Sequence, residues 1–258
     1  MNKVKILLIC FMPLMAAAQG PVSTRLSSGL DIGTGFRQEQ ISPSIAYYQL
    51  LNVTRQKLLS LGWTATLRAN YASNVDYITA PANLSRGGKT GFYALGAPLI
   101  AGNLDTLRMS SASGTSLNLG IRAQIHLKYV DIGATADLLG ITIGRNRIGQ
   151  YISSTGSFVV GTSAAGTDST ARFTGGHVSQ TAAPTIANLQ LLGDNSIGTL
   201  ATEVYARVLL GQRFGVKVGY QWLITEYTAS VKNVVDDNNR FRSRSGLTYV
   251  AVTIPFFR

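Results

Sequence analysis

A two-residue alternation of apolar and polar side chains runs through residues 116–129, which read SLNLGIRAQIHLKY. The apolar members are Leu117, Leu119, Ile121, Ala123, Ile125, Leu127 and Tyr129, and the members between them are Asn118, Gly120, Arg122, Gln124, His126 and Lys128. A period of two is that of a β-strand, whose successive side chains point to opposite faces of a sheet. The segment therefore predicts a strand with one apolar face and one polar face.

The same alternation recurs along the chain and predicts eight strands. The predicted strands are residues 26–37, 42–51, 59–71, 116–129, 130–138, 200–210, 214–225 and the final run 246–258. Their number and length are those of a small tilted transmembrane barrel. We expect an all-β fold, a single antiparallel transmembrane β-barrel. Ten strands remain an alternative if residues 92–99 or 156–162 form a further hairpin.

The connections between the predicted strands differ in length. Short ones are expected at residues 52–57, near 129–130 and at 211–213, a shorter one around 38–40, and a medium one at 230–240. Two are long, namely residues 74–114 and 145–197. Short periplasmic turns on one rim and long extracellular loops on the other are typical of outer-membrane barrels, with both termini in the periplasm.

A soluble barrel or sandwich is the competing interpretation, since it too would alternate. Only 14% of the residues are charged, well below the usual quarter. The polar positions are rich in Gly, Thr, Ser, Asn and Gln, and aromatic residues lie near strand ends, as Trp63, Tyr71, Tyr129, Phe214, Trp222 and Tyr227 do. An interfacial aromatic girdle needs such positions, so the pattern favours the membrane barrel.

Residues 1–18 have the pattern of a secretory signal peptide. Lys3 and Lys5 precede a short apolar run, and Ala16 and Ala18 stand where signal peptidase prefers small residues. We expect residues 19–258 to form the barrel domain, exported to the outer membrane. The single cysteine, Cys10, lies in the removed segment, so the mature chain is expected to have no disulfide and no thiolate metal site.

The chain carries a formal net charge of +11. A basic balance suits nucleic acid, but export argues against that partner and favours outer-membrane lipid and the phosphates of lipopolysaccharide. The long loops are small, polar and basic, which predicts mobile surface segments. Their candidate lipopolysaccharide contacts are Arg86, Lys89, Arg145, Arg147 and Arg172; an unknown extracellular ligand or protein partner is left open.

If lipid lies outside the barrel, the polar faces line the lumen. The charged residues expected there are Asp31, Arg68, Arg122, Lys128, Asp131, Asp137, Glu203, Arg207 and Lys217. An eight-stranded barrel has an interior that side chains fill, and charges buried there must be paired. The prediction is a closed, salt-bridged lumen; a narrow ion path is the alternative.

The sequence contains few residues that could form a catalytic, metal-binding or nucleotide-binding site. A hydrolase at the rim would need a general base such as His, and only His126 and His177 are present. His126 falls on the lumen face near the periplasmic end, which predicts a hydrogen-bonded packing role. Asp236 and Asp237 lack the regular ligand spacing of a calcium loop, and no phosphate loop or nucleotide fingerprint is present. We expect no enzyme, no metal and no cofactor.

The signal ending AAAQG, the segment DLLGITIG (137–144) and the end TIPFF before Arg258 resemble the small outer-membrane β-barrel proteins of Bacteroidota, with an OmpA/OmpX-like pattern of eight strands. The departure is Arg258, because such barrels usually end on the aromatic residue itself. The resemblance implies insertion by the barrel assembly machinery and a structural or surface-interaction role through the long loops. A porin-like narrow channel, a rim-located enzyme and a soluble exported binding module are the alternatives.

Overall fold

The computed structural model describes residues 25–54, 58–89, 92–162, 168–191, 195–211 and 213–257. The predicted signal peptide and Arg258 lie outside the described residues. The strands are β1 (Leu26–Arg37), β2 (Gln40–Asn52), β3 (Leu59–Thr79), β4 (Thr106–His126), β5 (Val130–Ile143), β6 (Arg147–Ile152), β7 (Ser157–Thr162), β8 (Asp168–Arg172), β9 (Ser179–Pro184), β10 (Ala187–Leu189), β11 (Leu200–Leu210), β12 (Phe214–Asn233) and β13 (Asn238–Phe257). The helical turns are α2 (Ala82–Ser85), α3 (Phe92–Gly96), η2 (Ala101–Asn103) and η3 (Gly175–His177).

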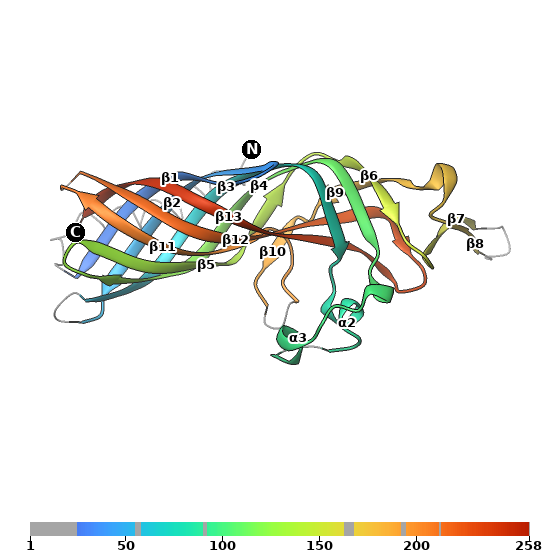
Figure 1. Ribbon diagram of the computed structural model, residues 1–258, viewed down its shortest axis with the longest axis horizontal. Coiled ribbons are helices and arrows are strands. Elements are labelled where there is room, and N and C mark those ends of the chain that lie inside the picture. Colours follow the sequence, from blue (N-terminus) through green and yellow to red (C-terminus); the bar gives the residue numbers. More distant parts are fainter. Residues whose placement is uncertain are drawn as a thin grey trace, which may run out of the picture.

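Eight strands close into an antiparallel ring, which forms the barrel at the left of Figure 1. Their order is β1-β2-β3-β4-β5-β11-β12-β13, and β13 pairs back to β1 with Ile32 opposite Val252. The predicted all-β fold, an antiparallel barrel of eight strands, is confirmed. In the described part of the chain no helix is long and apolar enough to cross a membrane.

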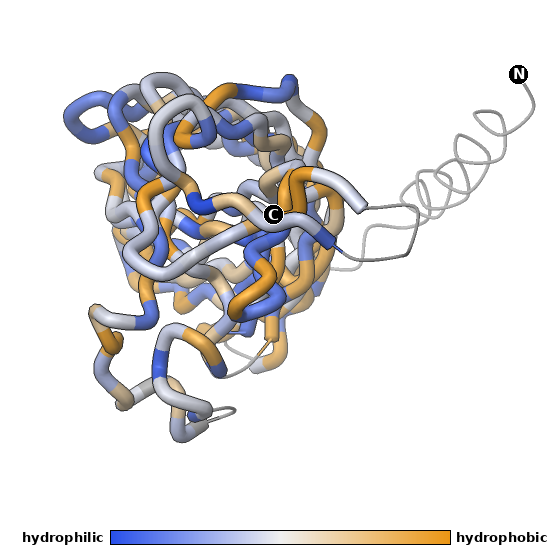
Figure 2. The backbone as a smooth tube through the Cα atoms, turned by 90° about the vertical axis from the view of Figure 1, so that its right-hand side faces the viewer, coloured by the Kyte–Doolittle hydropathy of each residue, from blue (hydrophilic) through white to orange (hydrophobic). Residues whose placement is uncertain are grey.

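The alternation in the sequence sorts the side chains of this eight-strand ring. Ile121 on β4 is 54% exposed on the outside, whereas the next residue, Arg122, is 2% exposed and points inward. Figure 2 shows the backbone in a view nearly along the barrel, and apolar and polar residues alternate along the chain. A slip of one residue in strand pairing would exchange the two faces, so the alternation specifies the register.

Four strands are longer than a barrel wall needs and continue into a second ring. β3 and β4 have 21 residues each, and β12 and β13 have 20 each. Beyond the barrel they pair with β6 and β9 in the closed order β3-β4-β6-β9-β12-β13, with β13 returning to β3 at Arg242 and Ile78. This six-strand ring lies at the right in Figure 1, and the β7–β8 hairpin projects beyond it.

The six-strand ring encloses an apolar core. Its buried members are Ala72, Val75, Tyr77, Leu107, Met109, Ala112, Tyr151, Phe158, Phe173, Ala182, Tyr227, Ala229 and Phe241. The rings of Tyr151 and Phe173 stack with centroids 3.7 Å apart. Each buried aromatic or aliphatic side chain contributes about 1.5–3 kcal/mol, so this core stabilises the loops that supply it. The sequence predicted Tyr227 in an aromatic girdle. This prediction is corrected, because Tyr227 lies in the core of the six-strand ring.

The inside and the outside exchange polarity between the two rings. On β4 the inward side chains are polar in the eight-strand ring, as Asn118 is, and apolar in the six-strand ring, as Met109 is. The alternation slips where the rings meet: Ser110 and Ser111 are both exposed, and on β3 Asn74 adopts a positive φ of 52°. Such an irregularity re-aims the side chains that follow it.

These extensions correct several predictions. The segments 74–114 and 145–197, expected as mobile loops, contain strands and helical turns of the six-strand ring. Of the two regions considered for a further hairpin, one is β7 and the other begins as α3, and neither joins the eight-strand ring. The predicted medium loop 230–240 shrinks to residues 234–237, because β12 and β13 extend into it. A strict two-residue template misses these segments because of the slip in alternation.

We predict that Leu107→Ala loosens the six-strand ring. Leu107 is fully buried in its core, and removing such a side chain costs about 2–5 kcal/mol through lost burial and the cavity left behind. Limited proteolysis should cut the 145–190 region faster, while the heat-modifiable gel mobility of the barrel is retained. Ile148→Ala, at a site 69% exposed on β6, is the matched control. Equal cleavage of both variants would contradict the packing described.

Candidate functional site

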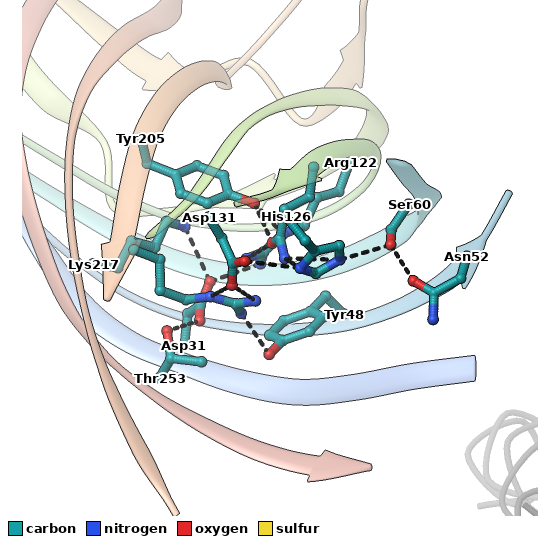
Figure 3. Close-up of polar contacts among 12 residues, drawn as sticks. Asp31, Tyr48, Asn52, Ser60, Arg122, His126, Asp131, Tyr205, Lys217 and Thr253 are labelled. Atoms are coloured by element: carbon teal, nitrogen blue, oxygen red, sulfur yellow. Dashed lines mark hydrogen bonds and ion pairs between the residues drawn. The ribbon is translucent and has the colours of Figure 1, made fainter. Parts of the chain in front are cut away.

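The candidate site is the polar interior of the eight-strand ring, to which its strands contribute inward side chains. Asp31 on β1 accepts hydrogen bonds from Arg122 on β4 at 2.7 Å and from Lys217 on β12 at 3.0 Å (Figure 3). The hydroxyl of Thr253 on β13 donates to its other oxygen at 2.6 Å. Lys217 also lies 2.6 Å from a carboxylate oxygen of Glu203 on β11. One carboxylate thus joins three strands to β1 across the barrel.

Arg122 is the largest fully buried side chain of this interior. Its guanidinium carbon lies 4.0 Å from the ring centroid of Tyr48 and 4.7 Å from that of Tyr205. Its Nε also donates to the Tyr205 hydroxyl at 2.6 Å. A desolvated cation between aromatic faces is stabilised by about 2 kcal/mol or more, which adds to the ion pair with Asp31.

A second ion pair lies between Arg68 on β3 and Asp137 on β5, with a separation of 2.7 Å. The same Asp137 oxygen accepts hydrogen bonds from the side chain of Asn118 and from the backbone N–H of Ala201, both at 2.9 Å. A buried carboxylate is tolerated when its lone pairs are satisfied in this way. Asp137 therefore anchors β3, β4, β5 and the start of β11 to one another.

A chain of hydrogen bonds crosses five neighbouring strands near the end of the barrel with the short turns. Arg207 on β11 donates to Asp131 on β5 at 2.7 Å, and Asp131 lies 2.8 Å from Nδ1 of His126 on β4. Nε2 of His126 lies 2.8 Å from Oγ of Ser60 on β3, whose hydroxyl donates to Asn52 on β2. Figure 3 shows this chain running toward Asn52.

Ser60, His126 and Asp131 have the spacing of a Ser-His-Asp triad, in which each step is about 2.6–3.2 Å. Their surroundings do not suit nucleophilic attack. Ser60 is 0% exposed and its hydroxyl donates to Asn52, while Asp131 is already paired with Arg207. A nucleophile must reach its substrate, so the geometry favours a role of these three residues in holding the strands together.

The structure brings together eight of the nine charged residues expected in the lumen. The buried members are Asp31, Arg68, Arg122, Asp131, Asp137, Glu203, Arg207 and Lys217. Lys128 is a correction: it is exposed in the β4–β5 turn, 5.0 Å from the ring centroid of Tyr129. The alternation ends with β4 at His126, so the turn rather than the strand orients Lys128. Without it, four cations face four carboxylates.

Sequence reasoning missed the tyrosines that flank Arg122. Tyr205 has the same parity as Glu203 and Arg207, but alternation alone assigns it no role. Tyr48 lies in β2, where apolar residues occupy both faces, so alternation alone does not define the facing of this strand. The signal was present at Ser42 and Ser44, which share the parity of Tyr48 and are buried with it.

Side chains fill the interior around the buried ion pairs. The cavity between Arg68, Arg122, Glu203, Lys217 and Tyr249 has a volume of about 10 Å³, which is room for about one water molecule. A buried apolar cluster of Ala201, Leu223 and Leu247 lies next to it along β11, β12 and β13. Among the described residues, no group of three or more His, Cys, Asp or Glu side chains is placed to hold a metal ion.

The five arginines and lysines predicted for lipopolysaccharide are dispersed. Arg86 follows α2 and donates to the carbonyl of Ala97, Lys89 is exposed three residues later, and Arg145 is exposed between β5 and β6. Arg147 donates to Ser113 at 2.8 Å, and Arg172 ends β8 on the distal hairpin. His177 packs its ring against Phe158 and Asp168 accepts from Thr162, so these two residues form no pair.

The fold therefore defines an antiparallel β-barrel with a closed polar interior and a second ring above it. A comparison with protein-family models finds no match, and neither does one with curated proteins. Among solved structures, the chain is similar to the outer membrane protein Ail of Yersinia pestis at 10% identity, with a TM-score of 0.33 and coverage of 89% of this chain and 99% of that one.

Two further solved structures have comparable similarity. Neisserial surface protein A is 11% identical, with a TM-score of 0.34 and coverage of 90% of this chain and 97% of the other. A Pseudomonas aeruginosa FadL homologue is 11% identical, with a TM-score of 0.25 and coverage of 91% and 76%. TM-scores this low say nothing about function. The barrel fold is defined by the strand pairing of this chain.

We predict that Asp31→Asn strongly destabilises the barrel. It removes the shared partner of Arg122 and Lys217, and an uncompensated buried charge costs about 3–5 kcal/mol. The measurement is urea unfolding of the detergent-refolded protein, followed by tryptophan fluorescence.

Asp76→Asn is the matched control for this change. Asp76 is ion-paired with Arg108 at 2.8 Å on the exposed face of the six-strand ring, and the hydrogen bond from Arg108 lowers the pKa of Asp76. Exposed pairs contribute little, so the control should unfold near the wild-type midpoint. Equal midpoints for Asp31→Asn and the wild type would contradict the network.

Proposed function

We propose that this chain is an outer-membrane β-barrel protein with a closed, ion-paired lumen, which acts at the cell surface through its six-strand ring. The observation that carries the proposal is the apolar belt around the eight-strand ring. Its exposed members include Ile32, Phe36, Ile45, Leu61, Leu67, Leu119, Ile121, Ile132, Leu139, Val204, Val216, Val218, Trp222 and Val252. Soluble monomers rarely expose contiguous apolar patches above a few hundred Å².

The height of the belt supports membrane insertion. On β12 it begins at Phe214, next to a short turn, and ends near Ile224. Ten residue steps at about 3.3 Å each, on a strand tilted by about 40°, span about 25 Å, which is the height of the apolar band of outer-membrane barrels. The charged interior then faces no lipid, in keeping with the cost of lipid-facing charge.

Export and assembly complete the proposal. The signal-peptide pattern of residues 1–18 directs the chain out of the cytoplasm, and the barrel assembly machinery inserts it, with the terminal strand β13 pairing to β1. The short turns then face the periplasm and the six-strand ring faces outward. The resemblance of the sequence to small outer-membrane barrels of Bacteroidota supports this part of the proposal.

A structural or surface-interaction role fits the filled lumen better than transport or catalysis. The cavity of about 10 Å³ beside Lys217 leaves no solute path there, and the Ser60–His126–Asp131 arrangement is shielded from substrate. We therefore propose no enzymatic activity and no cofactor. The partners would be outer-membrane lipid, including lipopolysaccharide, and an extracellular ligand or protein that contacts the six-strand ring.

We predict that membrane insertion tolerates an arginine on the six-strand ring but not in the belt. Ile121→Arg, at the lipid face near mid-belt, should cost about 2–4 kcal/mol, whereas Ile148→Arg, on the exposed face of β6, should cost little. Cell fractionation and heat-modifiable gel mobility report insertion of the wild type and both variants. A wild-type protein that stays soluble without detergent and shows no heat-modifiable mobility would overturn the membrane assignment.

We also predict a closed lumen in planar-bilayer recordings. The four cations and four carboxylates of the interior are held to one another by ion pairs, which opposes an open ion path. The inserted wild-type protein should leave the conductance near that of the bare bilayer. Large, stable conductance steps would establish the channel alternative instead.

A further inference from the structure

Arginine side chains gather beside a cleft on the outer face of β13, just above the eight-strand ring. The cleft has a volume of about 300 Å³, and it is lined by Asp76, Ile78, Thr79, Ser85, Leu99, Arg242, Ser243 and Arg244. The one carboxylate of this lining, Asp76, is ion-paired with Arg108 at 2.8 Å. The cleft lies where β13 has left β1, whose last pair is Phe36 with Thr248, and meets β3 at Ile78. We call it the arginine cleft.

Two arginines, Arg242 and Arg244, line the arginine cleft. Arg240 and Arg242 both donate to the buried carboxylate of Glu226, at 2.7–3.1 Å. Arg244 is exposed and lines the cleft directly, and Arg86 follows Ser85, another lining residue, at the end of α2. Each guanidinium has five N–H donors in a fork that fits phosphate, so an arginine that holds one acceptor still has donors for another.

The level of the cleft is that of lipid headgroups. Arg244 pairs across the sheet with Ile224, and two residues lower Gly246 pairs with Trp222. Trp222 is exposed and its ring packs against Tyr220, 4.9 Å away, just below the end of the apolar belt at Ile224. Arg244 therefore lies at the end of the belt, where the headgroup layer of about 5–8 Å begins.

Apolar side chains lie next to these charges. Leu99 lines the arginine cleft, and Leu99, Ile100 and Tyr93 are exposed on the excursion that carries α2 and α3. Figure 1 shows this excursion projecting sideways, away from the long axis, beside the six-strand ring and near its junction with the eight-strand ring. Exposed apolar and aromatic residues beside cations are typical of segments that lie in a membrane interface.

We propose that the arginine cleft binds the phosphate of an anionic lipid headgroup in the outer leaflet. Arg244 holds the phosphate at the mouth, Arg86 approaches it from the α2 side, and Arg242, fixed by Glu226, adds positive charge from behind. This inference rests on the proposed outer-membrane placement. It revises the set of contacts expected from the sequence, because among those five residues only Arg86 adjoins a lining residue of the cleft, Ser85.

The test uses the full mature chain refolded in detergent and native mass spectrometry with bisphosphorylated lipid A as the probe. The wild type should retain lipid A, and Arg244→Gln should weaken retention by about five-fold or more, because it removes charge-assisted hydrogen bonds to phosphate. Arg244→Lys should restore part of it. Lys232→Gln is the control, since Lys232 is an exposed cation farther along β12, paired with Asp237.

Two further probes separate the source of the phosphate. Dephosphorylated lipid A should bind as weakly to the wild type as lipid A does to Arg244→Gln, and inorganic phosphate at equal concentration should not displace lipid A. Displacement by inorganic phosphate would assign the cleft to a free anion and overturn the lipid proposal. Equal retention by the wild type, Arg244→Gln and Lys232→Gln would also overturn it.

Flotation of the refolded protein with phosphatidylcholine vesicles tests membrane placement separately. These vesicles carry no net charge, so flotation depends on the apolar belt and not on the arginine cleft. Flotation of both the wild type and Arg244→Gln, with loss of lipid A only from the variant, supports the proposal. Failure of the wild type to float would overturn the proposed function itself.

Discussion

The pairing of charge inside the eight-strand ring is the constraint on which the rest of the structure depends. Asp31 on β1 holds Arg122 on β4 and Lys217 on β12, and neither β4 nor β12 is a hydrogen-bonded neighbour of β1 in the ring. A buried ion pair that loses one member leaves an uncompensated charge. Barrel closure, strand register and charge pairing therefore depend on one another. A strand that slipped by one residue would expose its charges to the outside and bury its aliphatic residues.

The same strands serve two opposite arrangements of polarity. In the eight-strand ring β3, β4, β12 and β13 present apolar side chains outward and polar ones inward, and in the six-strand ring they enclose an apolar core. This exchange is what a chain needs if its lower half is surrounded by hydrocarbon and its upper half by water. The irregularity at Asn74 and at Ser110–Ser111 lies at the boundary, and the arginine cleft lies beyond it on β3, at Asp76 to Thr79.

Sequence reasoning succeeded where a rule of short range holds. The bounds of β1 and β11 were predicted exactly as observed, because an uninterrupted alternation is a local property. It failed at Lys128, where the strand ends and a turn sets the side-chain direction, and at Tyr48, where both faces of the strand are apolar. It also failed along the extensions of β3, β4, β12 and β13, because alternation that changes phase resembles a loop.

The sequence by itself determined which residues lie on each face of the barrel wall and which charged residues point inside. The reason is that successive side chains of a strand point to opposite faces. Only the tertiary structure decided which charges meet, because Asp31 and Lys217 are 186 residues apart and strand order brings them together. It also decided that the long connections form a packed ring and that Ser85 and Arg244 line one cleft. The ion pairs between distant strands and the second ring depend on how the sheet closes on itself, and no local sequence pattern predicts this closure.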